Sequence, residues 1–574
     1  MGDKMAEFIK TQNNFAYGEV APEFFAHDDI AGLSKLENMD VISGGGLTRR
    51  AGLVKVATLS ELARIIPFSV SDSENYILVI GDHHATVMAA DGSVVQSLTS
   101  PWSYDDAAKL QYAQRFGTLV LVHPDYQPRI ISPKTNGFEI KLFEFSTDSN
   151  MSVNIPFMKF DDASGITITV TSNSQGNNFA TFTTNQDFWS ADRVGERLLL
   201  MDLQWVIMSY VDARTVVAYT NSTYTLPSSA ITDWYEAAFG AYRGWPCSIT
   251  FHQDRLVFGG SRSYPSGIWM SQVGNHNNFS VGTGLDDEAI FVTLVSGQRQ
   301  QICTIVSSDN LQILTSVGEW AISNKPLTPA SVDIKQHTSV GSASSRYLAP
   351  QKIEGQTVFV SGNMHDIREL SLDELGENYN AKDLCSMSKH LINMPVDIAY
   401  NQLNRQLFIV LSDGTMAVLN QNSALGISAW GRYKTKGYFK SVAVQNNITY
   451  VVVQRNSTVY LEKFSTSALD DVGNDFDFCA SGLPIHVSGH NVSRVRIRKI
   501  SARVLNTKSL FINGKRVTLP NEIYDENSSG YSGDVSINQL GTSHTCIDSP
   551  WTIHGSDALP ATILSVSQYG SYGI

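Results

Sequence analysis

The chain is poor in charge and in cysteine. Charged residues are 17 % of its 574 residues, below the ~25 % usual in globular domains. No apolar run approaches the ~18 residues that a membrane-spanning helix needs, and the first seven residues lack the basic-then-apolar layout of a signal peptide. No Cys-x-x-Cys pair occurs, which favours a reduced protein made in a cytoplasm. The cysteines stand far apart, at Cys247, Cys303, Cys385, Cys479 and Cys546.

Length, aromatic content and net charge limit the classes further. With Phe 26, Tyr 22 and Trp 9, the chain is not of the disordered type. A chain of this length can bury a large core without a disulfide or metal staple, and it suggests roughly three or four domains. The net charge of -13 argues against a protein whose whole surface grips nucleic acid.

Strand signals dominate the chain. Residues 165–171 alternate apolar and polar side chains, as a half-buried strand does. Asp91-Gly92 and Asp413-Gly414 are hairpin-turn dipeptides between apolar runs. Short helices are expected only near residues 104–110 and 233–239. The sequence therefore predicts a mainly β protein.

A hairpin-like unit recurs along the chain. Most copies start ~40 to 55 residues apart, a spacing typical of four-stranded propeller blades. One blade cannot bury both of its faces, so blades must pack around an axis. The pattern predicts an irregular β-propeller of about seven blades, with copies at residues 68–88, 112–131, 249–270, 305–322, 356–370, 398–419 and 442–464.

Breaks in this spacing suggest the domain limits. The gap at 147–240 has its own alternating strands, at 166–171, 179–183, 197–208 and 215–219, and a structureless loop of that length is rare. We interpret it as an inserted β domain, and 467–574, with strands at 494–504 and 509–519, as a C-terminal β platform domain. The rest divides into an N-terminal segment, 1–60, packing on the propeller or platform, the first blades, 61–146, and the remaining blades, 241–466.

Signals for catalysis or metal binding are weak. The sequence has no nucleophile elbow, Walker A loop, His-Glu-x-x-His motif or EF-hand loop. His83-His84 and Asp286-Asp287-Glu288 have no further ligand at a diagnostic spacing, which favours solvated turns over metal sites. We therefore predict no catalytic residue, cofactor or metal. A glycosidase remains an open alternative, because its paired acids need not be close in sequence.

One basic stripe stands out near the C-terminus. In a strand, Arg494, Arg496 and Arg498 would share one face, and Val495 and Ile497 the other. Since the chain is acidic overall, ion pairing within or between subunits is favoured over contact with a phosphate backbone. An ordinary solvated sheet face is the remaining alternative.

The N-terminal region carries a series of short motifs. They are Asn14 to Pro22 with Gly18-Glu19, then Asp28-Asp29, Asn38, Gly44-Gly45-Gly46 and Thr48-Arg49-Arg50-Ala51-Gly52. This series resembles the opening of the tail nozzle proteins of short-tailed phages, the tail tubular protein B-like or stabilisation-type proteins. Two departures are Ala21 where the family usually has Ser, and Phe25-Ala26-His27 where an Arg commonly precedes the acidic residue.

The resemblance continues in the same order over nearly the whole chain. Each later motif is weak alone, and only their collinear order is specific. The main ones are Gln111-Tyr112-Ala113-Gln114, Trp234 to Phe239, Gly244-Trp245-Pro246, Phe251 to Ser261, Ile268 to Ser271, Thr315 to Trp320, Gly341-Ser342, Arg368-Glu369-Leu370, Asp383-Leu384, His390-Leu391, Trp430 and Leu461-Glu462.

Several of these residues suit structural roles. Arg49 and Arg50 follow a glycine-rich turn and could hold carboxylates or carbonyls of a neighbouring element, or form a solvated basic turn. Arg255, after Asp254 and before an apolar strand, is expected to tie blades together. Arg368-Glu369 is a further interface candidate. Five tryptophans are expected to be packing anchors and not ligand platforms. They are Trp234, Trp245, Trp269, Trp320 and Trp430.

The resemblance implies a non-enzymatic virion protein, made in the bacterial host cytoplasm. It would form a hexameric ring at the distal end of a short tail, as a channel and gate for genome ejection. Implied partners are the tail adaptor, tail fibres or spikes, the host cell envelope and double-stranded DNA that passes without specific binding. Six chains of -13 sum to about -78, which would repel DNA. A carbohydrate-binding tail adhesin and a polysaccharide hydrolase are the alternatives.

Overall fold

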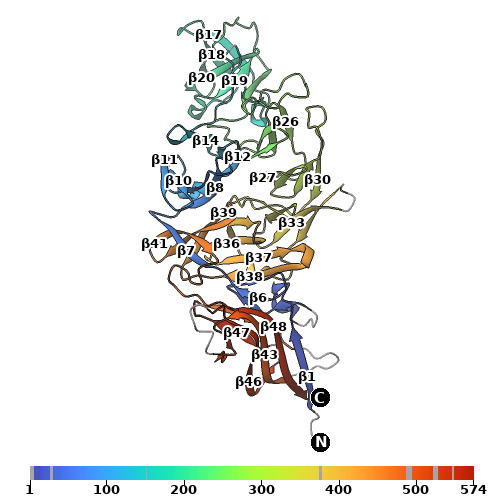
Figure 1. The fold of residues 1–574 in the computed structure, drawn as a ribbon. Helices are drawn as coiled ribbons and strands as arrows, with labels where there is room; N and C mark the ends of the chain where they lie inside the picture. Colours follow the sequence, from blue (N-terminus) through green and yellow to red (C-terminus); the bar gives the residue numbers. More distant parts are fainter. Residues whose placement is uncertain are drawn as a thin grey trace. The chain divides into compact units, whose positions relative to one another are not determined.

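Strands make up most of this computed structural model (Figure 1). It describes residues 5–25, 30–149, 151–373, 376, 378–485, 494–520, 528–545 and 548–573. Asp28, Asp29 and Cys546 lie outside these ranges. Within them, α1 (Tyr104–Ala107) is the single α-helix, as expected near 104–110, and no helix has the length and apolarity to cross a membrane. The chain forms two compact units, a first unit of residues 1–97 and 348–574 and a second unit of residues 98–347.

The unit of residues 98–347 contains three four-stranded antiparallel sheets, each a meander of neighbouring strands. Blades of a β-propeller are built in this way. The first sheet contains β12 (Gln111–Arg115), β13 (Thr118–His123), β14 (Tyr126–Lys134) and β15 (Gly137–Leu142). The second contains β23 (Ser248–His252), β24 (Arg255–Gly259), β25 (Gly267–Met270) and β26 (Ile290–Thr293). The third contains β27 (Ile302–Ser307), β28 (Leu311–Thr315), β29 (Glu319–Ile322) and β30 (Ile334–Thr338). The strand β24 is buried throughout because the core shared with β27–β29 covers one of its faces and a core that contains residues of β13 covers the other.

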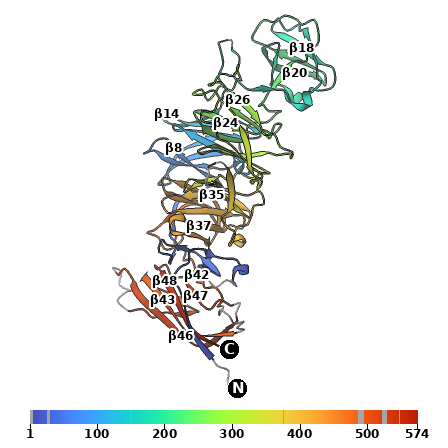
Figure 2. The same ribbon diagram turned by 90° about the vertical axis from the view of Figure 1, so that its right-hand side faces the viewer.

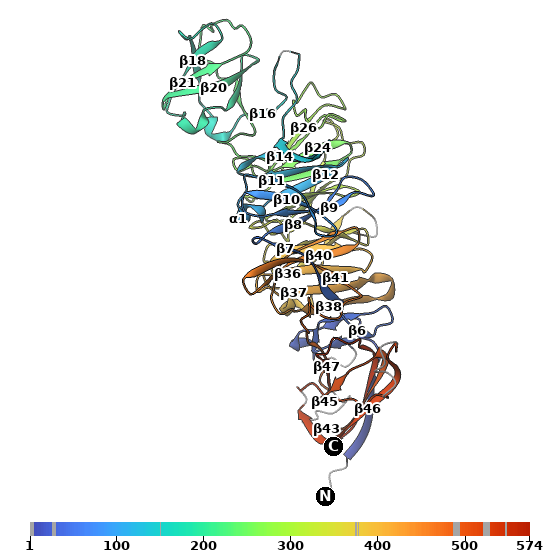
Figure 3. The same ribbon diagram turned by 60° about the vertical axis from the view of Figure 1, so that its left-hand side comes forward.

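The other unit contains four such blades. One contains β8 (Arg64–Ser69), β9 (Asn75–Ile80), β10 (His84–Ala89) and β11 (Val94–Thr99), and the next β31 (Gln351–Ile353), β32 (Gln356–Val360), β33 (Ile367–Leu372) and β34 (Tyr379–Asp383). A third contains β35 (Pro395–Asn401), β36 (Gln406–Leu411), β37 (Met416–Asn422) and β38 (Ile427–Tyr433). The fourth contains β39 (Tyr438–Gln445), β40 (Ile448–Arg455) and β41 (Thr458–Ser465) with β7 (Gly52–Leu59). The blade of β39–β41 is thus completed by a strand from the other end of the chain (Figure 3).

The prediction of a mainly β, propeller-type fold is confirmed. Each of the seven repeats coincides with one four-stranded blade in the described chain, and the hairpin turns form at Gly92 and Gly414, both with positive φ. The limits suggested for the five segments stay predictions.

The insertion forms a seven-stranded antiparallel sheet with its own core (Figure 2). Its core contains Trp205, Phe182 and Trp234. The strands are β16 (Phe157–Met158), β17 (Ile168–Ser172), β18 (Phe179–Thr184), β19 (Arg197–Leu200), β20 (Leu203–Asp212), β21 (Thr215–Tyr219) and β22 (Trp234–Ala237).

Two expectations for the insertion were wrong. The helix expected at 233–239 is the strand β22, which pairs with β19 and β16, because short apolar runs do not distinguish helix from strand. The single strand expected at 197–208 turns back at Met201 and Asp202, both with positive φ.

The C-terminal region joins strands from both ends of the chain. In Figure 1, blue β1 (Met5–Gln12) lies beside red β48 (Thr562–Gly573), and the two are antiparallel partners. Their six-stranded sheet also contains β5 (Met39–Val41), β6 (Leu47–Arg49), β43 (Arg494–Thr507) and β46 (Tyr531–Thr545). The strand expected at 509–519 is only the short hairpin of β44 (Phe511–Ile512) and β45 (Lys515–Arg516).

A second sheet joins blade and platform. Beyond β38, the sheet of β35–β38 continues through β4 (Lys35–Glu37), β42 (Phe478–Ser481) and β47 (Thr552–Gly555) to β44. N-terminal strands therefore belong to both the propeller and the platform, so the strands β1–β7 are an integral part of this unit. The segment between β2 (Gly18–Glu19) and β3 (Gly32–Leu33) starts with a 3-10 turn, η1 (Pro22–Phe24).

A buried hydrogen-bond network connects three blades of the same unit. Asp397 of β35 accepts hydrogen bonds from the Ser441 hydroxyl at 2.5 Å and the Val442 amide at 3.0 Å. The Ser441 oxygen in turn accepts from the Ile65 amide of β8 at 3.1 Å. Burial raises the pKa of Asp397, while the charge of Arg64 lowers it. This network fixes the spacing of neighbouring inner strands.

We predict that Asp397→Ala destabilises this unit. It leaves the Ser441 hydroxyl and the buried amides of Val442 and Ile398 without an acceptor, at a cost of about 3 kcal/mol. Asp397→Asn should cost less, because it keeps an acceptor. The apparent Tm measures the effect, with Asp413→Ala in an exposed turn as the control. Equal melting of the Asp397→Ala and Asp413→Ala proteins would contradict the role assigned to this hydrogen-bond network.

Candidate functional site

In the first unit (residues 1–97 and 348–574), motif residues of the N-terminal region contact distant segments in one buried place, the N-terminal joint. It comprises Gly18, Glu19, Asn38, Arg49 and Arg50 with their partners His390, Trp430 and Asp471. The joint lies where β4–β6 pass between the blade of β35–β38 and the platform sheets.

Arg50 is the central cation of the joint. Its side chain is fully buried, and its two terminal nitrogens lie 2.9 and 2.7 Å from the Asp471 carboxylate oxygens. Its Nε donates to Asn38 Oδ1 at 2.9 Å, and Nη2 donates to the Lys434 carbonyl at 2.9 Å. The Phe476 ring lies 3.6 Å from the guanidinium carbon. Arg50 thus connects the N-terminal segment to two later segments.

Arg49 binds carbonyl oxygens instead of a carboxylate. It donates to the carbonyls of Leu469 at 2.8 Å and Asp557, and the Phe476 ring also covers it at 4.3 Å. Burial and the neighbouring charge of Arg50 lower its pKa to about 10. Both arginines are buried, so a solvated basic turn does not form here.

Glu19 and Gly18 form the other half of the joint. Glu19 accepts from the Leu36 amide at 2.7 Å and lies 2.9 Å from His390 Nε2. Gly18 pairs with Trp430, and a Cβ at Gly18 would lie 2.2 Å from the Trp430 carbonyl oxygen. Its φ of +62° adds a second reason why this position requires glycine. The Trp430 indole nitrogen donates to the Leu384 carbonyl at 2.9 Å.

A polar cavity of about 480 Å³ lies beside the joint. Asp40 in its wall accepts from the Tyr433 hydroxyl at 2.5 Å and from Gln406 at 2.8 Å. Burial raises the pKa of Asp40, and these hydrogen bonds oppose the rise. With its acceptors engaged by neighbours in the same unit, Asp40 acts here as a hydrogen-bonding centre of the fold.

In the second unit (residues 98–347), Asp254 and Arg255 contact different blades. Asp254 sits in the exposed β23–β24 turn and pairs with Arg115 of β12 at 2.5 Å. That pair, with His276, lowers the pKa of Asp254. Arg255 is fully buried and donates to carbonyls of its own blade, including Ser271 at 2.8 Å, and more weakly to Leu327 of the next blade at 3.4 Å. Asp254 therefore makes the shorter contact between blades, and Arg255 mainly binds its own blade.

Arg368 belongs to a compact charge cluster. It lies 3.2 Å from Asp366 and 3.7 Å from Asp383, and Lys389 lies 3.1 and 3.0 Å from the same two carboxylates. The two acids and Cys385 are close enough to share a cation. However, Arg368 and Lys389 already neutralise both carboxylates, and burial raises the pKa of the Cys385 thiol to about 12. This donor set fits a metal ion poorly.

The neighbouring Glu369 is half-buried outside this cluster. Burial raises the pKa of its carboxyl, and the charge of Lys382 on the adjacent strand opposes the rise.

The basic stripe of β43 has the expected alternation. Arg496 and Arg498 are exposed, whereas Val495 and Ile497 are buried. Arg498 pairs with Glu7 of β1 at 2.7 Å, within the same chain. The side chain of Arg494 lies outside the described residues. Arg503 further along pairs with Asp534 at 2.8 Å.

Other motifs flagged in the sequence are ordinary parts of the fold. His83 and His84 lie in an exposed turn near Asp82 and Glu61, and Glu288 accepts the Gly284 and Leu285 amides of its own loop. Four of the five tryptophans are buried, and Trp245 is half-buried. The described cysteines, Cys247, Cys303, Cys385 and Cys479, are free thiols.

Comparisons with known proteins are limited to structural neighbours. No family model matches the chain, and no curated protein matches it. BamB from Moraxella catarrhalis aligns over 72 % of this chain and 98 % of its own, at 12 % identity and a TM-score of 0.33. The RRP9 WD40 repeats align over 73 % and 100 %, at 7 % identity and a TM-score of 0.34. The Cps50 (Swd1) β-propeller domain of Myceliophteria thermophila aligns over 72 % and 100 %, at 8 % identity and a TM-score of 0.34.

We predict that Arg50→Ala strongly destabilises the first unit. It leaves Asp471 as a buried carboxylate without its partner, which typically costs about 4 kcal/mol. Arg50→Lys should be intermediate, because lysine cannot bond both carboxylate oxygens in the same planar geometry. The apparent Tm and the soluble yield measure the loss. Arg503→Ala, which removes an exposed ion pair, is the control and should melt like the unmodified protein; equal melting of all three variants would contradict the assignment.

Proposed function

We propose that this chain is a non-enzymatic structural protein of a phage virion, the nozzle at the distal end of a short tail. The observation that supports this proposal is where the motif residues lie. Asn38 meets Arg50, Glu19 meets His390, and Gly18 meets Trp430, although Glu19 and His390 are 371 residues apart and Gly18 and Trp430 are further apart still. Residues that carry the resemblance are therefore used to join segments of the fold.

Buried joints of this kind suit a part that must keep its shape under load. An ion pair such as Arg50–Asp471 has no exposed atoms to offer a substrate, and its geometry limits the relative movement of the segments it connects. A nozzle must hold a channel against packaged DNA and open only when triggered. In this proposal the joint supplies rigidity, and contacts between copies, the adaptor and the fibres supply the ring.

The ring is tested by mass and by imaging. Purified full-length chain is mixed with the adaptor protein of the same virus, and the complex is studied by mass photometry and cryo-electron microscopy. We expect a closed ring with six copies of the 63.1 kDa chain. The adaptor alone is the control. A chain that stays monomeric in the presence of the adaptor would contradict the proposal.

The charge of the chain leads to a second prediction. With -13 per chain, the assembled ring should not retain double-stranded DNA at ~0.15 M salt, because unlike a basic protein it gains nothing from releasing DNA counterions. A gel-shift assay with a short duplex measures this. Retention of the duplex at micromolar ring concentration would show that the channel binds DNA and would contradict the proposed free passage.

A further inference from the structure

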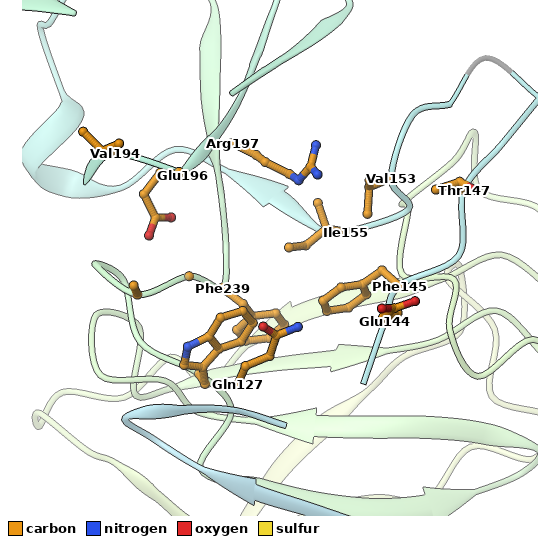
Figure 4. A pocket seen from close by; sticks show the side chains of 14 residues that line it. Gln127, Glu144, Phe145, Thr147, Val153, Ile155, Val194, Glu196, Arg197 and Phe239 are labelled. Carbon is orange, nitrogen blue, oxygen red and sulfur yellow. The ribbon is translucent and has the colours of Figure 1, made fainter. Parts of the chain in front are cut away.

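A cavity of about 510 Å³ lies at the foot of the inserted domain, within the unit of residues 98–347 (Figure 4). The start of β19 forms one side, and the loop after β15 and the segment after β22 form the others. Its volume is in the range of small-molecule sites, which are typically mostly apolar with a few polar groups. None of the motif residues predicted as interface candidates lines it.

Aromatic side chains form much of the wall. Phe145 and Phe239 are stacked, with ring centroids 6.4 Å apart and an interplanar angle of 9°. Phe145 is held in turn by edge contacts with the rings of Phe143 at 5.4 Å and Phe279 at 5.7 Å. Half-buried Trp245 also lines the space. These rings are fixed before any ligand enters, which lowers the entropic cost of binding.

Glu196 supplies an acceptor at a specially built position. Its Oε1 accepts from the Tyr242 amide at 2.9 Å, and its side chain packs on Gly240, where a Cβ would lie 2.0 Å from Oε2. Burial raises the pKa of Glu196, and the nearby guanidinium groups of Arg193 and Arg243 oppose the rise. Glycine at position 240 is thus required for the carboxyl group to lie here.

Arg197 supplies the donors. It is half-buried, and burial alone lowers its pKa. The described residues offer its guanidinium no hydrogen bond or ion pair, in contrast to the paired Arg193 and Arg243 nearby. Gln127 donates its amide to the Phe143 carbonyl at 3.1 Å and presents its oxygen as a further acceptor. Because Arg197 is only half-buried, water can reach its guanidinium, whose donors are therefore available to a ligand.

We propose that this cavity binds a neutral saccharide of one or two pyranose units. Sugar hydroxyls both donate and accept, so different hydroxyls of one ligand can accept from the Arg197 guanidinium and donate to Glu196 and Gln127. The apolar C–H faces of a pyranose ring fit the aromatic wall. The lining carries both signs of charge, Arg197 against Glu196 and Glu144, so it offers no net attraction to one sign and favours a neutral ligand. The site goes beyond the proposed nozzle role and would give the protein a contact with glycans of the host surface.

Saturation-transfer NMR on the full-length chain tests the proposal. The probes are the neutral disaccharides maltose, cellobiose and lactose, with glucuronic acid and glucosamine as charged comparisons. We expect at least one neutral disaccharide to bind with a Kd below about 10 mM, and more tightly than either charged sugar. Arg197→Gln and Trp245→Ala should each weaken that binding at least tenfold.

Arg214→Gln is the matched control. Arg214 lies in the same inserted domain, is exposed and pairs with Asp187 outside the cavity, so its replacement should leave saccharide binding unchanged. Circular dichroism and the apparent Tm verify that each variant is folded. The proposal is overturned if no neutral disaccharide binds, if a charged sugar binds more tightly, or if folded Arg197→Gln and Trp245→Ala proteins bind like the unmodified chain. Ring formation is measured separately and does not depend on this result.

Discussion

The buried ion pair between Arg50 and Asp471 is the contact on which the first unit depends. It sits where N-terminal strands pass between a propeller blade and the platform, and it is enclosed by Asn38 and the Phe476 ring. A buried pair of this kind adds little net stability over apolar residues, but removing one partner is very costly. Its value therefore lies in specificity, because few other arrangements of these segments can satisfy both charges.

The same logic holds in the unit of residues 98–347. Arg193 and Arg243 share the Glu236 carboxylate at 2.6 Å each, and Arg243 also bonds Asp162. These groups lie at the base of the inserted domain, next to the saccharide cavity. Both arginines of this cluster have carboxylate partners, whereas the described residues offer none to the Arg197 guanidinium beside it. A rigid base and an open, largely aromatic cavity with a few polar groups thus lie side by side in this unit.

Local sequence signals were enough to predict much of the fold. Each blade contains turn residues and apolar runs that are close together in the sequence, so the repeat and the inserted domain could be recognised. Partners far apart in the chain could not: nothing near Arg50 indicates Asp471, and nothing in β41 indicates β7. The cavity was missed for the same reason, since Glu196 and Arg197 become a site only when Phe145 and Trp245 fold against them. Residues 233–239 were misjudged because strand pairing with β19 overrides a short, ambiguous apolar pattern.

Residues 36–50 are an integral, largely buried part of the fold and not an appended arm. Hydrogen–deuterium exchange measured by mass spectrometry on the full-length chain tests this claim most directly. Peptides that cover residues 36–50 should exchange as slowly as those that cover β38, since their amides share hydrogen bonds with the same sheets. Exchange of residues 36–50 as fast as the exposed loop at 281–287 would contradict the claim.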